Sequence, residues 1–266
     1  MKQLLRLDRY LSETGIGTRS EIKIWIRKGL VALNGGVVKS PETKVNPDTD
    51  EVTVNGSPIR LEALEYYMLN KPAGVVSATE DCREKTVLDL ITQPKRKDLF
   101  PVGRLDKDTE GLLLITNDGP LAHSLLSPKK HVDKVYYARI DGLVTEQEIR
   151  RFEEGLVVDS GLTALPARLE ILKTNADTGT SEIRLTIHEG KFHQVKRMFE
   201  AVDRKVTYLK RLSMGPLVLD EILRPGEFRK LTESEISALQ HVTAEKEQTK
   251  EEHEKGDFHE RKKTSF

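Results

Sequence analysis

The hydrophobic pattern of this 266-residue chain changes near residue 60, and that change is the strongest constraint on its fold. Before it, apolar residues recur at helical spacing over residues 4–11 and again over residues 18–26, where Thr18 can cap a helix. Asn-Gly pairs then separate short strand-like runs, as they do in β-hairpins. Residues 1–60 are therefore predicted to form a small α/β domain of two helices and a short sheet.

Residues 61–242 mix strand-like and helix-like runs without a regular alternation of the two. Strands are predicted at residues 66–69, 111–115, 134–140 and 181–187, and helices at residues 119–126, 145–155 and 192–202. Because the regular strand–helix beat of a parallel fold is missing, we expect an α+β domain with a mixed, mostly antiparallel central sheet. Residues 243–266 have almost no aliphatic side chains and are predicted to be a disordered, charged tail.

Composition narrows the class of protein further. Lys and Arg together number 43, as do Asp and Glu, which argues against a chain that is basic throughout. A single cysteine, Cys82, excludes an internal disulfide framework and a zinc site built from several cysteines. No apolar run approaches the roughly 20 residues of a membrane helix, and residues 1–6 lack a signal-peptide pattern. We therefore expect a cytoplasmic protein without membrane contacts, and we expect it to be a monomer.

A local excess of positive charge is present at the N-terminal end, where residues 1–60 include ten basic and seven acidic side chains. Arg19, Lys23 and Arg27 fall four residues apart on one helical face, where their charges repel unless an anionic partner lies opposite. A solvated helix face is the alternative, but RNA phosphates are an obvious partner. The predicted RNA-binding residues of this end are Arg6, Arg9, Arg19, Lys23, Arg27 and Lys28.

The order of features in this end is similar to that of a known domain. A helix, an Arg-Ser-Glu turn at residues 19–21, a second helix and a Val-x-Leu-Asn-Gly hairpin at residues 31–35 follow one another. This order resembles the S4-type RNA-binding domain over nearly all of residues 4–55. The resemblance implies that residues 1–60 bind RNA.

Several ionisable side chains lie within seven residues just before the apolar strand predicted at residues 111–115; four of them are Arg104, Asp106, Asp108 and Glu110. By themselves they allow three interpretations: a nucleophilic or basic carboxylate, a magnesium site made by the three acidic residues, or a polar loop. The magnesium interpretation is weakened because the chain has no Gly-rich Lys-Ser/Thr loop to cradle the phosphates of a nucleotide.

A third polar segment covers residues 187–199. His188 and His193 are five residues apart with Gly190 between them, which does not fit the i, i+4 spacing of a zinc-protease helix. The segment instead reads as a strand end followed by a helix start that exposes His193, Gln194, Lys196 and Arg197. Taken alone, it could be a cationic helix docked by its apolar face.

Together the segments resemble the ordered motifs of pseudouridine synthases. The motifs are residues 70–77, residues 103–106 with Gly-Arg-Leu-Asp, and residues 190–198 with Gly-Lys-Phe-His-Gln-Val-Lys-Arg-Met. The resemblance runs from residue 4 to residue 239 and is closest to the branch that modifies ribosomal RNA and carries an N-terminal S4-type domain. Residues 78–81, 86–90, 165–167 and 193–194 are most similar to the small-subunit members of that branch.

The resemblance implies a pseudouridine synthase fold and a cofactor-free, metal-free isomerisation of uridine. It makes Asp106 the catalytic residue, either as nucleophile or as base, and places Lys196 beside it as a counter-charge. Arg104 would help to hold RNA once the base leaves its stack, and Tyr136 would stack on the uracil, while its neighbour Tyr137 is expected in the core. Further RNA contacts are expected from Lys191, His193, Gln194 and Arg197.

The same resemblance implies that the substrate is 16S ribosomal RNA at position 516, either free or in a small-subunit assembly intermediate. Two alternatives stay open. The chain could act on 23S ribosomal RNA as a related enzyme of the same branch. It could also be a catalytically silent RNA-binding assembly factor, although the intact Asp106, Lys196 and Tyr136 argue against this.

Overall fold

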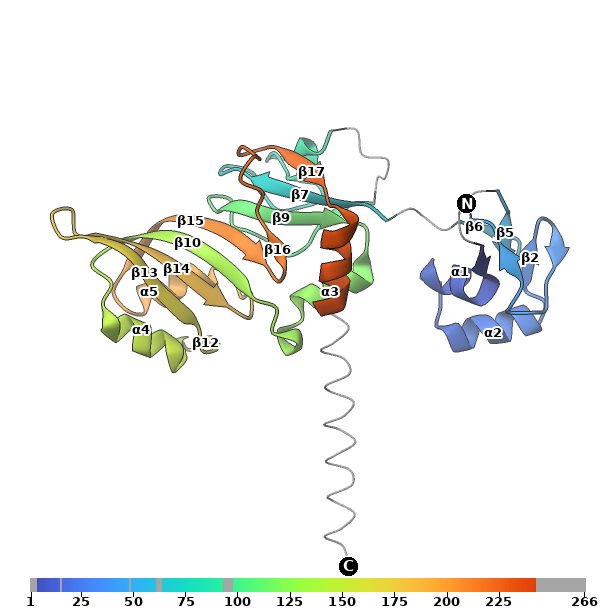
Figure 1. Cartoon of the computed structure of the whole chain (residues 1–266), viewed down its shortest axis with the longest axis horizontal. Coiled ribbons are helices and arrows are strands. Elements are labelled where there is room, and N and C mark those ends of the chain that lie inside the picture. Colours follow the sequence, from blue (N-terminus) through green and yellow to red (C-terminus); the bar gives the residue numbers. More distant parts are fainter. Residues whose placement is uncertain (1–3, 15, 48, 61–63, 93–97, 243–266) are drawn as a thin grey trace, which may run out of the picture. The chain divides into compact units, whose positions relative to one another are not determined.

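The computed structural model describes residues 4–14, 16–47, 49–60, 64–92 and 98–242, and it divides the chain into two compact units, Met1–Ala63 and Leu64–Phe266 (Figure 1). The charged tail expected at residues 243–266 lies outside the described residues. Among the described helices, none has the length and apolar character needed to cross a membrane.

The N-terminal unit contains two helices and a small sheet. Its elements are β1 (Leu5–Arg6), α1 (Leu7–Glu13), α2 (Arg19–Arg27), β2 (Val31–Leu33), β3 (Gly36–Val37), β4 (Lys44–Val45), β5 (Val52–Val54) and β6 (Ser57–Ile59). The sheet has the strand order β3-β2-β5-β6, and β1 pairs separately with β4. The two helices and the hairpin predicted for this end are confirmed.

Local sequence signals explain these elements. Thr18 caps α2 by accepting a hydrogen bond from the backbone N–H of Glu21, whose side chain in turn accepts one from the backbone N–H of Thr18. Asn34 and Asn55 each have a positive φ of 51° and precede a glycine, as a tight hairpin turn requires. Leu7, Leu11, Ile22 and other apolar side chains are fully buried between the helices and the sheet.

The second unit contains most of the strands. Its elements are β7 (Tyr66–Lys71), η1 (Leu88–Leu90), β8 (Phe100–Pro101), β9 (Glu110–Thr116), α3 (Gly119–Leu126), η2 (Pro128–Lys130), β10 (Lys134–Asp141), α4 (Glu146–Glu153), β11 (Leu156–Asp159), β12 (Leu162–Ala164), β13 (Arg168–Asn175), β14 (Thr180–Ile187), α5 (Gln194–Glu200), β15 (Lys205–Met214), β16 (Leu217–Val218) and β17 (Phe228–Lys230). A further helix covers residues 233–242.

The long sheet of this unit has the order β13-β14-β10-β15-β9-β7-β17, with β16 beside β15 and β8 beside β9. Neighbouring strands are antiparallel except β9 and β15, which are parallel. The prediction of an α+β fold with a mixed, mostly antiparallel sheet is therefore confirmed, as are the strands predicted within β7, β9, β10 and β14.

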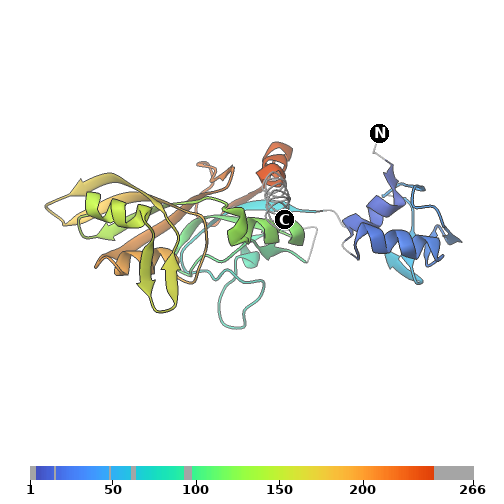
Figure 2. The same ribbon diagram turned by 90° about the horizontal axis from the view of Figure 1, so that it is seen from below.

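Helices cover the sheet on both faces (Figures 1 and 2). Strands β7 and β9 bury side chains on both sides, so Met68 and Leu112 pack in one core with Leu125 of α3. The opposite core contains Leu113 together with Phe152 of α4 and Phe199 of α5. Burial on both faces explains why β9 reads as a continuous apolar run and lacks the alternation of a surface strand.

Glycine is required where the two parallel strands meet. Gly111 of β9 lies opposite Arg211 of β15 and has a φ of +99°. A Cβ at this position would collide with the backbone N and O atoms of Arg211. The close approach fixes the start of β9, and with it the polar loop at residues 102–109 that precedes the strand.

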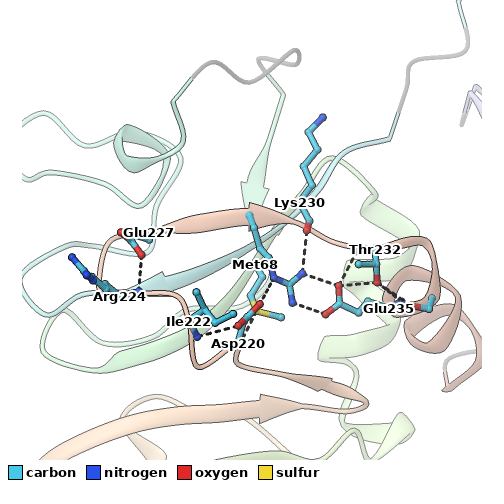
Figure 3. A network of polar contacts seen from close by, with 10 residues as sticks. Met68, Asp220, Ile222, Arg224, Glu227, Lys230, Thr232 and Glu235 are labelled. Carbon is cyan, nitrogen blue, oxygen red and sulfur yellow. Dashed lines mark hydrogen bonds and ion pairs between the residues drawn. The ribbon is translucent and has the colours of Figure 1, made fainter.

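An ion-pair network attaches the helix at residues 233–242 to the edge of the sheet (Figure 3). Arg229 of β17 donates one hydrogen bond to Asp220, at 2.6 Å, and two to Glu235, at 2.9 and 2.8 Å. Glu235 also accepts a hydrogen bond from the backbone N–H of Thr232, at 2.8 Å, which closes the first turn of the helix. These hydrogen bonds, that from Arg229 first, lower the pKa of Glu235 from its ordinary value to about 2 although burial opposes the shift.

A pH-dependent loss of stability follows from this depressed pKa. The carboxylate of Glu235 stabilises the fold at pH values above its unfolded pKa, and this contribution is lost as the pH falls through the folded pKa of about 2. Glu235→Gln should lower the free energy of unfolding by about 1–2 kcal/mol at pH 7, and the difference from the wild-type protein should shrink towards pH 2. Urea unfolding at both pH values measures this difference.

Glu233→Gln is the matched control, because Glu233 is exposed and belongs to the same helical turn. It should leave stability nearly unchanged at both pH values. Equal stability of Glu235→Gln and the wild-type protein at pH 7 would contradict the role given to the network.

Candidate active site

The loop at residues 102–109 carries Asp106, and hydrogen bonds attach it to the segment that follows β7. The hydroxyl of Ser77 donates to the carbonyl of Leu105, at 2.9 Å, and accepts from the N–H of the same residue, at 3.1 Å. The N–H of Gly74 donates to the carbonyl of Lys107, at 2.7 Å. The loop itself turns tightly, because the N–H of Thr109 reaches the carbonyl of Asp106 at 3.0 Å. These bonds hold the backbone on both sides of Asp106.

A buried lysine also attaches this loop to the sheet. Lys71, the last residue of β7, is fully buried, and its Nζ donates to the carbonyls of Pro72, Lys107 and Thr109 at 3.0, 3.3 and 2.8 Å. Burial lowers the pKa of Lys71 to about 8, against the attraction of nearby carboxylates, of which Asp108 acts most strongly. The residue type alone gave no sign of this structural role, because a lysine at a strand end is usually exposed.

Lys196 of α5 bridges two of the acidic side chains in the loop. Its Nζ lies 3.0 Å from Oδ2 of Asp106 and 2.6 Å from Oδ1 of Asp108. Burial disfavours the charged lysine, but the hydrogen bonds to Asp108 and Asp106 outweigh it and raise the pKa of Lys196. The side chain of Asp106 is 23% exposed, whereas that of Asp108 is 72% exposed. Asp106 is therefore the carboxylate of the pair that faces the protein.

The start of α5 brings Lys196 and His193 to this carboxylate. His193 adopts a left-handed conformation with a φ of 47° immediately before the helix, and its Nε2 lies 3.5 Å from Oδ1 of Asp106. Val195, Met198 and Phe199 anchor the helix in the core. Lys196 and His193 are therefore held beside Asp106 by a rigid element.

Glu110 is directed elsewhere. It accepts a hydrogen bond from the hydroxyl of Tyr208, at 2.7 Å, and burial together with this bond raises the pKa of the tyrosine. Asp106 and Asp108 share Lys196, so the three carboxylates considered for a magnesium site are divided between two partners. Within the described ranges, no three His, Cys, Asp or Glu side chains gather in a way that could hold a metal ion.

A small pocket of about 80 Å³ opens beside Asp106. Tyr136 of β10, which is 7% exposed, forms part of its wall together with Leu209 and Val195. The wall also includes Arg211, whose buried Nε donates to the carbonyl of Leu112 at 2.8 Å. Two buried polar atoms of this wall, Nη2 of Arg211 and Oγ1 of Thr109, have no hydrogen-bond partner among the described residues. The pocket thus has an apolar wall around Tyr136, and the two unpaired atoms lie buried behind its surface.

The neighbouring tyrosine lies on the opposite face of β10. The hydroxyl of Tyr137 donates to Glu182, at 2.7 Å, and its ring makes an edge contact with Tyr208, with centroids 6.0 Å apart. The expectation that Tyr137 is the core residue was wrong, since it is Tyr136 that lies in the hydrophobic core. Alternation of side chains was predicted correctly, but the sequence does not reveal which face of a strand a helix covers.

A large pocket of about 540 Å³ adjoins the small one and shares Arg104, Asp106 and His193 with it. Its wall also includes Lys107, Lys191 and Phe192. Arg104 is exposed at this surface, and among the described residues it forms no ion pair. The predicted residues Asp106, Arg104, Tyr136 and Lys196 are therefore brought together.

Other residues that were expected to bind RNA use their side chains in hydrogen bonds or ion pairs within the protein. Gln194 is buried: its Oε1 accepts from the N–H of Lys191, at 2.9 Å, and its Nε2 donates to the buried Glu189, at 2.8 Å. Lys191 pairs with the same glutamate at 3.0 Å, and Arg197 makes two hydrogen bonds to Asp159. Gln194 thus supports the turn before α5 and does not present its side chain outwards, in contrast to the expectation.

The predicted RNA-binding residues of the N-terminal unit fall into two groups. Arg6 pairs with Asp8 and Glu42, and Arg9 pairs with Glu13. Lys23 is half-buried, while Arg19, Arg27 and Lys28 are exposed and form no ion pair with any described residue. The exposed side of α2 is thus cationic, which is the charge expected of a surface that meets phosphates.

Comparisons with known proteins match both units. Residues 65–201 match the family described as RNA pseudouridylate synthase, and residues 5–52 match the S4 domain. An uncharacterized RNA pseudouridine synthase of Bacillus subtilis (strain 168) is 51% identical over 88% of this chain and 98% of its own length. Ribosomal large subunit pseudouridine synthase B of the same organism is 40% identical over 88% of this chain and 95% of its length.

Two further comparisons cover the same extent. Ribosomal small subunit pseudouridine synthase A of Yersinia pestis is 38% identical over 88% of this chain and 98% of its length. A crystal structure of a pseudouridylate synthase superposes with a TM-score of 0.63 at 39% identity, over 88% of this chain and 99% of the other. The chain therefore belongs to the RNA pseudouridylate synthase family, carries an S4 domain at its N-terminal end and is a pseudouridine synthase.

Proposed function

We propose that this enzyme converts one uridine of ribosomal RNA to pseudouridine, that the RNA is 16S ribosomal RNA, and that the target is position 516. The names of similar proteins support a ribosomal substrate but include both a small-subunit and a large-subunit synthase, at 38% and 40% identity. Overall identity does not separate the two substrates. The 16S assignment is favoured by the similarity of residues 78–81, 86–90, 165–167 and 193–194 to small-subunit enzymes.

The observation that carries the catalytic proposal is the pairing of Asp106 with Lys196 at the edge of the small pocket. The reaction breaks the bond between C1′ of ribose and N1 of uracil and forms a bond between C1′ and C5. The proton on C5 is lost and N1 gains one, so atoms balance without a second substrate. A carboxylate at the sugar can act as nucleophile at C1′ or as base at a ribose proton, and both roles fit Asp106.

The target base must leave its helix before a carboxylate can reach its glycosidic bond. The apolar wall of the small pocket and the ring of Tyr136 would take up the flat faces of the extruded uracil. Arg104, which is exposed beside the pocket, would contact the RNA around the position that the target base leaves in its helix.

Lys196 would keep Asp106 in its reactive state once RNA excludes water from the pocket. A carboxylate that loses its hydration needs a counter-charge, and the Nζ of Lys196, at 3.0 Å, provides one on a fixed helix. Asp108 pairs with the same Nζ from a position that is 72% exposed, so water can replace much of its contribution.

Mapping of the modified nucleotide tests the substrate assignment. Cells with and without this gene should differ in one uridine that is converted to pseudouridine, detected by reverse transcription of total ribosomal RNA treated with carbodiimide and then with mild alkali. The proposal expects that uridine at position 516 of 16S ribosomal RNA. A difference confined to 23S ribosomal RNA would replace the 16S assignment by the large-subunit one, and unchanged ribosomal RNA would contradict a ribosomal target.

Substitution of Lys196 tests the counter-charge. Lys196→Met should lower the single-turnover rate of pseudouridine formation by about 100-fold or more, because the reacting carboxylate loses its charged partner in the closed site. Lys196→Arg should recover part of that rate. Tritium release from RNA labelled at C5 of uridine measures it.

Asp108→Asn is the matched control, because Asp108 shares the same lysine but is mostly exposed. It should change the rate by no more than about threefold. A larger loss in Asp108→Asn than in Lys196→Met would contradict the division of roles.

A further inference from the structure

The turn before α5 carries an exposed aromatic side chain that the reaction at Asp106 does not use. Phe192 is 66% exposed and lines the large pocket but not the small one. The side chain of a phenylalanine is stabilised by about 1.5–3 kcal/mol when it is buried, so a ring left in water invites a partner. Phe192 was predicted as the first residue of a helix, but it precedes α5, which begins at Gln194.

The exposure of Phe192 does not come from a loose loop. Gln194 closes the turn, since its N–H donates to the carbonyl of Lys191, at 3.1 Å, and its Oε1 accepts from the N–H of the same residue. Arg197 donates from Nη1 to the carbonyl of Phe192, also at 3.1 Å, while its other nitrogens are held by Asp159. The backbone that carries the ring is therefore fixed on both sides.

The ring of Phe192 is also fixed in orientation. It stacks on the imidazole of His193, with centroids 3.8 Å apart and planes inclined by 18°. His193 in turn lies 3.5 Å from Asp106. The two rings thus form a continuous stack that begins at the reacting carboxylate and ends at the exposed ring in the wall of the large pocket.

The charge around this stack is suited to RNA. Arg104, Lys107 and Lys191 line the large pocket, and Arg104 forms no ion pair within the described part of the chain. A cationic pocket with an exposed aromatic ring matches the usual arrangement for an unpaired nucleotide, in which the base stacks on the ring and a basic side chain meets the phosphate. An apolar peptide would leave the charge of Arg104 without a counterpart, whereas Lys107 and Lys191 already pair with Glu84 and Glu189.

We propose that the large pocket is a second nucleotide subsite, in which an unpaired base adjacent to the target uridine stacks on Phe192. The large pocket offers room for a second base, because its volume of about 540 Å³ adjoins the pocket of about 80 Å³ beside Asp106 and shares part of its wall. Arg104 lies in the wall of both pockets, where it can meet the phosphate that joins the two nucleotides. The enzyme would thus recognise an unpaired dinucleotide, with the second base held outside the reaction.

The proposed subsite rests on the proposed function in one respect only: the RNA fragment used to test it is taken from ribosomal RNA. The test uses whichever ribosomal RNA fragment the wild-type enzyme is found to modify, so a wrong 16S assignment and a wrong subsite give different results. Three versions of the fragment are compared. The first is natural, the second lacks the base on the 5′ side of the target uridine, and the third lacks the base on its 3′ side. For each version, the single-turnover rate is measured with the enzyme in excess over the fragment but below saturation. The affinity for the fragment is measured by fluorescence anisotropy.

The enzyme variants are Phe192→Ala, Phe192→Trp and, as a matched control, Ile222→Ala, which removes another exposed apolar side chain far from the pocket residues in sequence. With wild-type enzyme, loss of one of the two neighbouring bases should weaken binding about tenfold. Phe192→Ala should bind the natural fragment about tenfold more weakly and should show no further loss with that abasic fragment. Phe192→Trp should restore binding, and Ile222→Ala should behave as the wild type.

Two results would overturn the proposal. One is a Phe192→Ala enzyme that binds and modifies the natural fragment as well as the wild type does. The other is a Phe192→Ala enzyme that loses as much affinity with each abasic fragment as the wild-type enzyme does, because the substitution and the missing base would then act independently of one another. Because the ring is exposed, all variants should keep the melting temperature of the wild type, and the fold-changes then report RNA contact.

Discussion

The buried ammonium group of Lys71 is the contact on which the candidate active site depends. Its three hydrogen bonds join the end of β7 to the carbonyls of Pro72, Lys107 and Thr109, and the latter two flank the turn that carries Asp106. Taking a lysine out of water is costly, and here carbonyl oxygens and the carboxylates of Asp108 and Asp106 offset the cost. The geometry of the loop is thus set by a strand of the central sheet.

The residues that surround Asp106 come from other strands of the sheet and from helix α5. Helix α5 follows β14, and Gly111 lets β9 and β15 approach closely enough to place the Asp106 loop beside that helix. Lys196 then bridges Asp106 and Asp108, while Tyr136 and Arg211 complete the pocket from β10 and β15. A reacting carboxylate, its counter-charge and a pocket for a flat base are therefore held on rigid elements, which favours catalysis by positioning.

Much of this arrangement could be predicted from residue patterns. The features that could not be predicted were all missed for the same reason, which is that they depend on burial. Strands β7, β9, β10 and β14 have long apolar or alternating runs, whereas the unpredicted β15 contains charged residues such as Arg211, whose burial is visible only in the fold. Asp106, Lys196 and Tyr136 were identified by resemblance to a family. Lys71 and Phe192 lie within the matched motifs but were given no role, because a sequence gives the type of a side chain but not whether it is buried or exposed.

The rate of pseudouridine formation by Asp106→Asn tests the central claim most directly, because this change keeps the shape of the side chain and removes its charge and nucleophilicity. Under single-turnover conditions with saturating enzyme, tritium release should fall by at least about 1000-fold, while RNA affinity and melting temperature stay close to those of the wild type. Such a result would separate chemistry from binding. Turnover at a rate comparable to the wild type in Asp106→Asn would contradict the account.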